Sequence, residues 1–261
     1  MSKFEERKKK LLDTLQVKKK MDVQEASDLI GISPATARRF FSQLAKEGIA
    51  VRIHGGIQLL TESSGTYSYI LSNTRRVHEK ALIAAKAVNL IQEGDLLFLD
   101  SGTTILKMAE ALELRLRTEK LEGVVIVTNS LVNYEKLSEF CKVILVGGEV
   151  RLTRRDTCGH LAEKALESLH VHKSFFGADA IHPEKGLMAT DEWTCRMNGI
   201  VRRNSDSVYV LADSEKFGRS SLMTYSTLDA VDCIYTDDGI SNEEIALYRE
   251  KGAKIEVITG F

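Results

Sequence analysis

The sequence predicts an α/β protein in two parts: a small N-terminal winged helix-turn-helix and a larger, mostly parallel α/β sheet domain. Capped helical patterns fill the first part, and short apolar runs alternate with helical patterns in the second. The charge is also divided unevenly. Residues 1–56 hold twelve Lys and Arg against seven Asp and Glu, whereas the other 205 residues hold 24 basic and 30 acidic residues. A basic head on an acidic body indicates that the head meets a polyanion.

The composition fits a globular protein, because 43% of the 261 residues are hydrophobic and 28% are charged. No apolar run approaches the roughly 18 residues that span a bilayer, and the N-terminus has no signal-peptide core. We therefore expect a cytoplasmic protein with no membrane partner. The four cysteines form no CxxC pair, which favours buried, reduced thiols.

The head is predicted to contain three helices. Apolar residues at helical spacing mark the first over residues 4–15. The capping-box pattern of residues 22–25 begins the second helix, and Gly31 ends it. Ser33 caps the third helix, which carries Pro34 at its first position and ends at Gly48.

The third helix carries a polar face formed by Thr36, Arg39 and Gln43, with Arg38 beside it. Two helices joined by a tight glycine turn, with Arg and Thr near the start of the second, are typical of a helix-turn-helix. Its second helix enters the major groove. There, Arg can bond guanine bidentately and Thr can contact a thymine methyl group or a phosphate.

Residues 49–60, IAVRIHGGIQLL, predict two short strands that turn at Gly55 and Gly56. They would form a basic wing with Arg52 and His54 near the phosphates or the minor groove. The alternative is a three-helix cap whose arginines are merely solvated. The predicted DNA contacts are Ser33, Thr36, Arg38, Arg39, Gln43, Arg52 and His54.

The segment ISPATARRFFSQLAKEGIAVRIHGG resembles the recognition helix and wing of the DeoR family of bacterial transcriptional regulators. Phe40 stands where that family usually has Asp, and Ala37 where it often has Ile. The loss of the acid could change how the arginines are oriented, and so the operator sequence. The matching residues are Ser33, Thr36, Arg38, Arg39, Leu44, Gly48, Arg52, His54, Gly55 and Gly56.

The body alternates apolar runs with helical patterns, which predicts a mostly parallel sheet covered on both faces. The apolar runs are residues 96–99, 124–127, 143–146, 174–176, 208–211, 233–235 and 255–258. The helical patterns include residues 79–91, 105–112, 131–140, 161–169 and 242–251.

Small or hydrogen-bonding residues follow five of these strands, and ligands of open α/β sheets bind beyond the carboxyl ends of strands. Residues 101–104 lie at a strand-to-helix junction, where amides, hydroxyls and the helix dipole favour a phosphate. Lys216 could add a positive charge, and Asp179 could accept a hydroxyl. A phosphorylated sugar or polyol fits these groups. The alternative is that Ser101 and Thr103 simply cap a helix, as residues 129–130 often would.

The body also resembles the effector domain of the DeoR family, in the pieces RRVHEKALIA, GDLLFLDSGTT, VIVTNSL, VILVGGEVR, FFGADAI, TDEW and LADSEKFG. That domain is similar in fold to ribose-5-phosphate isomerase, glucosamine-6-phosphate deaminase and CoA transferases. The resemblance implies that a phosphorylated sugar binds at the strand ends and alters DNA affinity. The implied contacts are Asp100, Ser101, Gly102, Thr103, Thr104, Thr128, Asn129, Ser130, Gly147, Gly148, Asp179 and Lys216.

The segment TCRMNGI departs from the family pattern, which carries Glu-Ala-x-Val-Lys upstream of the segment at residues 213–216. Asn198 stands near the place of that lysine, and Arg196 could substitute for it. Alternatively, the ligand carries less negative charge at this point.

An isomerase-like enzyme with a DNA-binding head is the main rival. Aldose–ketose isomerisation needs a general base within reach of a substrate C–H, and Asp100 and Asp191 are the candidates. The acid that follows Gly-Ala-Asp in phosphate-sugar isomerases of this fold is absent, because Ala180 follows Asp179. We therefore expect no catalysis.

A metal site or a thiol sensor would use other residues. His170 and His172 could place two imidazoles on one side of a strand, with His160 and Cys158 upstream. This spacing is not that of a zinc knuckle, so we expect no metal and no cofactor. A redox sensor would be built on Cys158 or Cys195, without further support from the sequence.

The predicted organisation is a winged helix-turn-helix at residues 1–57, a linker at 58–77, and an effector-sensing and oligomerisation domain at 78–261. The predicted function is sequence-specific transcriptional regulation, as a repressor of a carbohydrate-utilisation operon controlled by a phosphorylated sugar. A single helix-turn-helix makes few base contacts. We therefore expect a homodimer or homotetramer that reads repeated half-sites of double-stranded operator DNA.

Overall fold

The computed structural model of the chain describes residues 3–46, 49–59, 69–119 and 121–260. These residues belong to two compact units, Met1–Leu71 and Ser72–Phe261. Gly48, predicted to end the third helix, and much of the predicted linker lie outside the described residues. No described helix combines the length and the apolar character needed to cross a bilayer.

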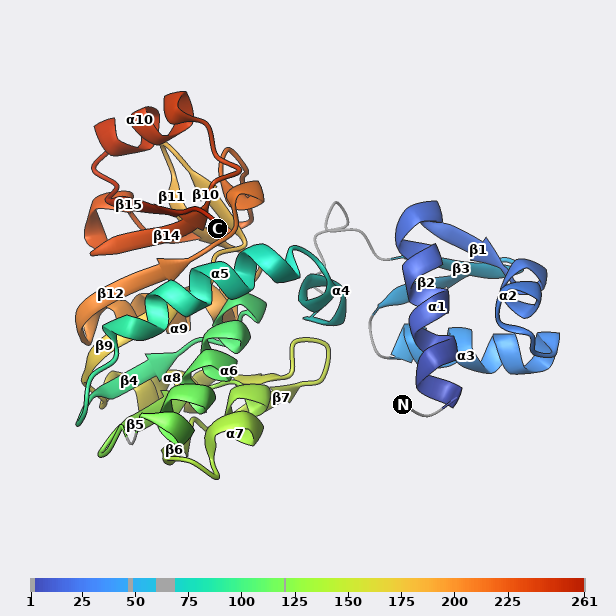
Figure 1. The fold of residues 1–261 in the computed structure, drawn as a ribbon, viewed down its shortest axis with the longest axis horizontal. Helices are drawn as coiled ribbons and strands as arrows, with labels where there is room; N and C mark the ends of the chain where they lie inside the picture. The colour runs from blue at the N-terminus through green and yellow to red at the C-terminus, as the bar shows by residue number, and fades with distance from the viewer. Residues whose placement is uncertain (1–2, 47–48, 60–68, 120, 261) are drawn as a thin grey trace. The chain divides into compact units, whose positions relative to one another are not determined.

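The first unit contains three helices and a three-stranded antiparallel sheet (Figure 1). The predicted capping box forms, because Asp22 accepts from the Glu25 amide and Glu25 accepts from the Asp22 amide. The sheet order is β1-β3-β2, so the predicted two-stranded wing has a third strand. The elements are α1 (Lys3–Lys18), β1 (Lys20–Asp22), α2 (Val23–Ile30), α3 (Pro34–Lys46), β2 (Ala50–Ile53) and β3 (Gly56–Leu59).

The apolar faces of these helices meet in one core, in which Leu11, Leu15 and Phe41 are fully buried. Phe4 of α1 stacks on Phe40 of α3, with ring centroids 4.8 Å apart. Phe40 therefore joins the two helices by an aromatic contact at the position where the resemblance led us to expect an acid.

The second unit is built on a seven-stranded, fully parallel sheet of order β15-β14-β12-β9-β4-β5-β6. Apart from an overhang of at most one residue, each predicted apolar run lies in one of its strands, which confirms the predicted sheet. The strands are β4 (Leu96–Leu99), β5 (Val125–Thr128), β6 (Lys142–Leu145), β9 (Val171–Phe176), β12 (Ser205–Leu211), β14 (Cys233–Asp237) and β15 (Ile255–Ile258).

Helices cover both faces of this sheet (Figure 1). Strand β4 shows the division, because Leu97 and Leu99 enter one core and Phe98 enters the other. One face carries α5 (Val77–Ala87), α6 (Thr103–Thr118) and α7 (Leu131–Leu137); the other carries α8 (His160–Glu167), α9 (Glu192–Arg203) and α10 (Asn242–Glu250). Helix α4 (Tyr69–Thr74) precedes them, and the 3₁₀ turn Val88–Leu90 continues α5 to the predicted end of that helix.

Five short strands of the second unit were not predicted. β7 (Glu149–Arg151) and β8 (Asp156–Cys158) form a hairpin, and β10 (Ala180–His182), β11 (Gly186–Ala189) and β13 (Met223–Ser226) form a small antiparallel sheet. Strands of three or four residues are too short to show an alternation of apolar and polar side chains.

Candidate functional site

The strand order of the parallel sheet reverses between β4 and β9. From β4 the chain continues to β5 and β6 at one edge, and from β9 it continues to β12, β14 and β15 at the other edge. Ligands of open α/β sheets bind beyond the carboxyl ends of strands at such a reversal. The predicted anion cradle lies there. Asp100 Oδ2, after β4, accepts a hydrogen bond of 3.1 Å from the Gly177 amide, after β9. We call the loops that follow β4, β5, β6, β9 and β12 the carboxyl rim.

Helix α6 begins at this rim without a side-chain cap, because its N-cap residue is Gly102. Ser101 Oγ donates to Asp156 Oδ2 (3.0 Å), and Thr103 Oγ1 accepts from Lys80 Nζ (3.0 Å). The alternative in which Ser101 and Thr103 merely cap the helix is therefore wrong. The N-cap residue of α6 therefore supplies no side-chain oxygen to the first amides of the helix.

Thr128, Asn129 and Ser130 hold neighbouring loops of the rim together. Thr128 Oγ1 donates to the Leu99 carbonyl (2.6 Å), and Asn129 Nδ2 donates to a β8 carbonyl (3.1 Å). Ser130 Oγ caps α7 by accepting from the Asn133 amide (3.1 Å), which is the structural role that the sequence left open. All three residues are buried, so they stiffen the rim.

Gly147 and Gly148 lead from β6 into the β7–β8 hairpin. A Cβ on Gly148 would collide with the Cys158 carbonyl oxygen, whereas a Cβ on Gly147 would meet open space. Gly148 is therefore required for close packing of the hairpin. What both residues can offer a ligand is their backbone.

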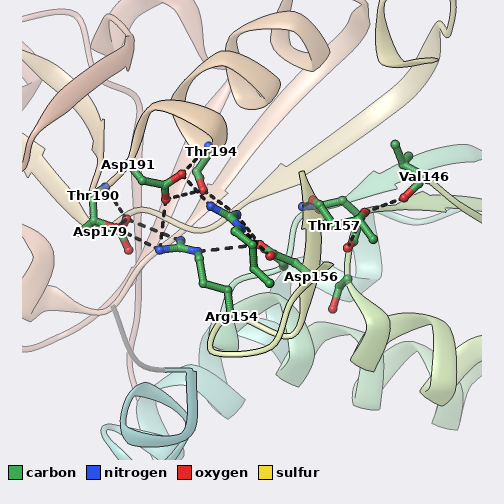
Figure 2. Close-up of polar contacts among 12 residues, drawn as sticks. Val146, Arg154, Asp156, Thr157, Asp179, Thr190, Asp191 and Thr194 are labelled. Atoms are coloured by element: carbon green, nitrogen blue, oxygen red, sulfur yellow. Dashed lines mark hydrogen bonds and ion pairs between the residues drawn. The ribbon is translucent and has the colours of Figure 1, made fainter. Parts of the chain in front are cut away.

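The β7–β8 hairpin brings two arginines to the rim that were not among the predicted site residues. Arg151 bonds both carboxylate oxygens of Asp156 (2.8 and 2.6 Å) and one of Asp191 (2.7 Å). Arg154 lies 3.2 Å from Asp191, 3.8 Å from Asp156 and 4.0 Å from Asp179 (Figure 2). These cations are thus held among carboxylates from three segments, namely β8, the loop after β9 and the N-cap of α9.

Asp179, the predicted hydroxyl acceptor, already accepts hydrogen bonds in this network. The amide and the hydroxyl of Thr190 donate to its Oδ2 at 2.8 and 2.9 Å (Figure 2). The Thr190 hydroxyl also receives a hydrogen bond from Arg154 (3.0 Å). The loop after β9 is therefore joined to the start of α9 through polar contacts that a ligand hydroxyl could replace.

The two carboxyls that could serve as bases have opposite pKa shifts. Burial raises the pKa of Asp100 to about 6, while the Ser101 and Gly177 amides and the charge of Arg154 act against that rise. Burial also acts to raise the pKa of Asp191. Arg154 and the other donors around Asp191 outweigh it, and they hold the pKa below its usual value. Asp191 also caps α9, a structural role that occupies its oxygens.

Two lysines act on the β12 end of the rim. Lys216 follows β12 in a 3₁₀ turn. Burial raises the pKa of Asp213, and the charges of Lys216 and Lys80 act against that rise. Lys80 was not predicted, yet its signal is visible in the sequence: it shares an inward face of α5 with Ile83 and Ala87 at helical spacing. A lysine in an apolar stripe marks a buried cation with a specific partner.

Arg196, the possible substitute for the lysine of the family pattern, lies among carboxylates. Its guanidinium lies 3.1 Å from Glu192 and 3.5 Å from Glu163 of α8, and more than half of its side chain is exposed. Asn198 is buried in α9. The cations at the start of α9 come from the β7–β8 hairpin instead.

Helix α3 presents its polar face to solvent. Arg38, Arg39 and Gln43 are exposed, and within the described part of the chain neither arginine forms a hydrogen bond or ion pair through its side chain. Ser33 Oγ accepts from the Thr36 amide (3.3 Å) and lies 2.9 Å from the Thr36 hydroxyl, so the predicted cap forms. The guanidinium groups are thus open to a polyanion.

The wing lies against the same helix. Arg52 Nη1 of β2 donates to Ser42 Oγ of α3 (3.1 Å). His54 and Gly55 form the two-residue turn between β2 and β3, and Gly55 takes a positive φ of 74°. His54 is exposed at this turn. Helix and wing together have the arrangement of a winged helix-turn-helix.

The residues of the metal and thiol alternatives do not converge. His170 Nε2 lies 2.8 Å from Asp206 at the start of β12, whereas His172 Nδ1 accepts from the amide that begins β4. Among the described residues, no three His, Cys, Asp or Glu side chains gather as metal ligands. Burial raises the thiol pKa of Cys158 and Cys195, which is opposite to the shift of a reactive thiolate.

Similarity to solved structures is slight. The chain is 21% identical to ribose 5-phosphate isomerase A from Methanocaldococcus jannaschii over 53% of each chain, with a TM-score of 0.40. It is 18% identical to eIF2B delta from Chaetomium thermophilum over 57% of this chain and 52% of that one, with a TM-score of 0.40. Scores of this size carry no conclusion about activity.

Similarity to sequence families extends over both units. The DeoR-like helix-turn-helix domain matches residues 7–63, and the DeoR C terminal sensor domain matches residues 75–238. The transcriptional repressor AccR of Agrobacterium fabrum is 32% identical over 90% of each chain. The lactose phosphotransferase system repressor of Lactococcus lactis subsp. lactis is 31% identical over 92% of this chain and 93% of that one. The chain therefore belongs to the DeoR family of helix-turn-helix transcriptional repressors.

Proposed function

We propose that the chain represses a carbohydrate-utilisation operon and that a phosphorylated sugar bound at the carboxyl rim controls its affinity for the operator. The observation that carries this proposal is the uncapped N-terminus of α6 at the strand reversal, with Lys80 held against Thr103. Helix amides and a cation suit a phosphate, whereas carboxylates such as Asp179 suit sugar hydroxyls. The rim therefore offers both kinds of partner that a sugar phosphate requires.

The effector contacts extend over several loops of the rim. A relative named as a repressor of the lactose phosphotransferase system supports a carbohydrate operon. We expect the arginines of the β7–β8 hairpin, Arg151 and Arg154, to take part. The proposed contacts from the sequence are Asp100, Ser101, Gly102, Thr103, Thr104, Thr128, Asn129, Ser130, Gly147, Gly148, Asp179 and Lys216.

The proposed organisation keeps a DNA-binding domain at residues 1–57, a linker at 58–77 and a sensing and oligomerisation domain at 78–261. Because one helix-turn-helix reads few bases, a homodimer or homotetramer binds repeated half-sites. The operator contacts are Ser33, Thr36, Arg38, Arg39, Gln43, Arg52 and His54.

A thermal-shift screen of the full-length protein tests the effector proposal. Phosphorylated sugars are compared with the same sugars without phosphate, since a ligand at about 100 times its Kd stabilises by about 2.7 kcal/mol. Thr103→Val should remove most of the shift. Thr118→Val, the same change at the exposed C-terminal end of α6, is the matched control. Equal shifts from sugars with and without phosphate, or no shift from any, would refute the proposal.

A sugar-phosphate isomerase-like enzyme with a DNA-binding head is the second candidate. The observation that favours it is the raised pKa of Asp100, about 6, which suits a general base near neutral pH. Incubation of each stabilising sugar with the protein distinguishes the two. Formation of an isomer supports the enzyme, and stabilisation without turnover supports the sensor.

A further inference from the structure

Lys80 connects the predicted effector site to the segment through which the chain enters the second unit. Its ammonium donates to Thr103 Oγ1 (3.0 Å) at the start of α6 and to the Ser72 carbonyl (2.6 Å) in α4. Ser72 is the first residue of that unit. The exposed fractions of Lys80 and Ser72 are 4% and 6%, so water competes little for these bonds.

The Ser72 carbonyl has a second, longer contact inside its own segment. The Arg75 amide donates to it at 3.3 Å, within the turn that ends α4. That bond moves with α4 and does not attach it to the sheet. The ammonium of Lys80 is therefore the contact that ties this carbonyl to the carboxyl rim.

The other end of the same segment is anchored independently of the cradle. Arg76 Nη2 donates to Asp237 Oδ2 (2.6 Å) and to Ser214 Oγ (3.1 Å). Asp237 is itself fixed by the Ser214 amide (2.7 Å) and the Gly239 amide (3.2 Å). Arg76 also has a positive φ of 50°, a strained conformation that makes a sharp corner before α5. Arg76 is thus a fixed point, and the bond at Ser72 can be released without it.

We propose that Lys80 transmits effector binding to the head: an anion at the N-terminus of α6 takes the ammonium from the Ser72 carbonyl and so weakens the attachment of α4. A phosphate oxygen carries a full charge, whereas a carbonyl oxygen carries only a dipole, so the ammonium prefers the phosphate. Thr103 already places the ammonium beside the uncapped helix end. Lys80 acts as a positioning residue for α4, which leads to the head.

This inference rests on the proposed function, since it needs an anion beside Thr103, and it adds the route by which binding is communicated. Its test measures hydrogen–deuterium exchange of the full-length protein with and without saturating inorganic phosphate. Binding is monitored separately by ³¹P line broadening, which Thr103→Val should reduce. In the wild-type protein, phosphate should speed exchange of the α4 amides, including that of Arg75, by about tenfold.

Two substitutions assign the effect to Lys80. In Lys80→Met the α4 amides should exchange fast with or without phosphate. Lys86→Met is the matched control, because Lys86 lies on the same helix, is half exposed and pairs with Glu256 at 3.1 Å; it should behave as wild type. The wild-type comparison decides the inference even where Lys80→Met does not fold.

Three results would overturn the inference. Phosphate that broadens the ³¹P signal but leaves α4 exchange unchanged refutes the coupling and leaves the proposed function standing. Phosphate acceleration of α4 exchange that is as large in Lys80→Met as in the wild type shows that another contact transmits binding. Absence of ³¹P broadening removes the anion site, and with it both the coupling and the proposed function.

Discussion

Replacing Asp100 by Asn should stabilise the sheet domain at neutral pH and lose this effect in acid. Burial raises the pKa of this carboxyl from its ordinary 3.8 to about 6. The folded state therefore binds the proton more tightly than the unfolded state, so the ionised carboxylate destabilises the fold above the folded pKa. The difference between 3.8 and about 6 corresponds to a destabilisation of about 3 kcal/mol above pH 6. Below the pKa of the unfolded state, this destabilisation disappears.

The substitution also changes hydrogen bonds. Asp100 Oδ2 accepts from the Gly177 amide, and the side-chain carbonyl of Asn can keep that bond. The NH₂ group of Asn cannot accept a hydrogen bond in place of the second carboxylate oxygen. The loss of that hydrogen bond lowers the stability by about 1 kcal/mol. The expected net gain is about 2 kcal/mol at pH 7.5, or a rise in Tm of about 4–8 °C for a domain of this size.

Urea unfolding between about pH 4 and pH 8 measures this gain, followed by the fluorescence of Trp193, the single tryptophan, in α9. Asp95→Asn is the matched control. Asp95 is equally buried but accepts from Lys173 at 2.6 Å, so its neutralisation should destabilise the protein at pH 7.5. Two results would refute the reasoning: an Asp100→Asn protein that is no more stable than wild type at pH 7.5, or one whose gain in stability over wild type is as large at pH 4 as at pH 7.5.

Other substitutions test single contacts. Arg39→Ala should weaken operator binding in fluorescence anisotropy without changing the effector thermal shift, and unchanged DNA affinity would contradict the docking of α3. The logarithm of the wild-type binding constant for DNA should fall linearly with the logarithm of the salt concentration, with a slope of about −0.9 for each phosphate neutralised. Arg151→Met should lower the free energy of unfolding in urea by about 3–5 kcal/mol, because fully buried Asp156 loses its bidentate partner. Gly148→Ala should cost about 1–3 kcal/mol in the same assay, because its Cβ collides with β8, whereas Gly147→Ala should be nearly neutral.

The parallel sheet was predictable because its strands carry short apolar runs, and those of the inner strands are buried on both faces. Residues 96–99 are the clearest case, since all four are apolar and they face two different cores. The small sheet was not predictable, because its strands have only three or four residues and one of its two pairings is distant in sequence. Ala189 of β11, for example, pairs with Met223 of β13 across the whole of α9 and β12.

The position of the candidate site could be predicted, because ligands of open α/β sheets bind beyond the carboxyl ends of the strands. The arginines that lie at this site could not be predicted. Arg151 and Arg154 reach the rim only through a hairpin whose strands are too short to recognise. The hydroxyls of Ser101 and Thr103 were assigned a possible capping role because their real partners are distant in sequence. Lys80 could have been found, since it interrupts an apolar helix face.

The pairing of the rim arginines limits what an effector can do there. Arg151 is held bidentately by Asp156 at 2.8 Å or less, whereas Arg154 lies 3.2–4.0 Å from three carboxylates and donates to the Thr190 hydroxyl at 3.0 Å. A ligand shifts an equilibrium only by the difference between its affinities for the two states. A phosphate that merely joined the existing network would bind without regulating. An effector that regulates must replace existing hydrogen bonds with new ones. The ammonium of Lys80 donates both at the start of α6 and to the Ser72 carbonyl, so a new bond from it to the effector would also weaken the attachment of α4.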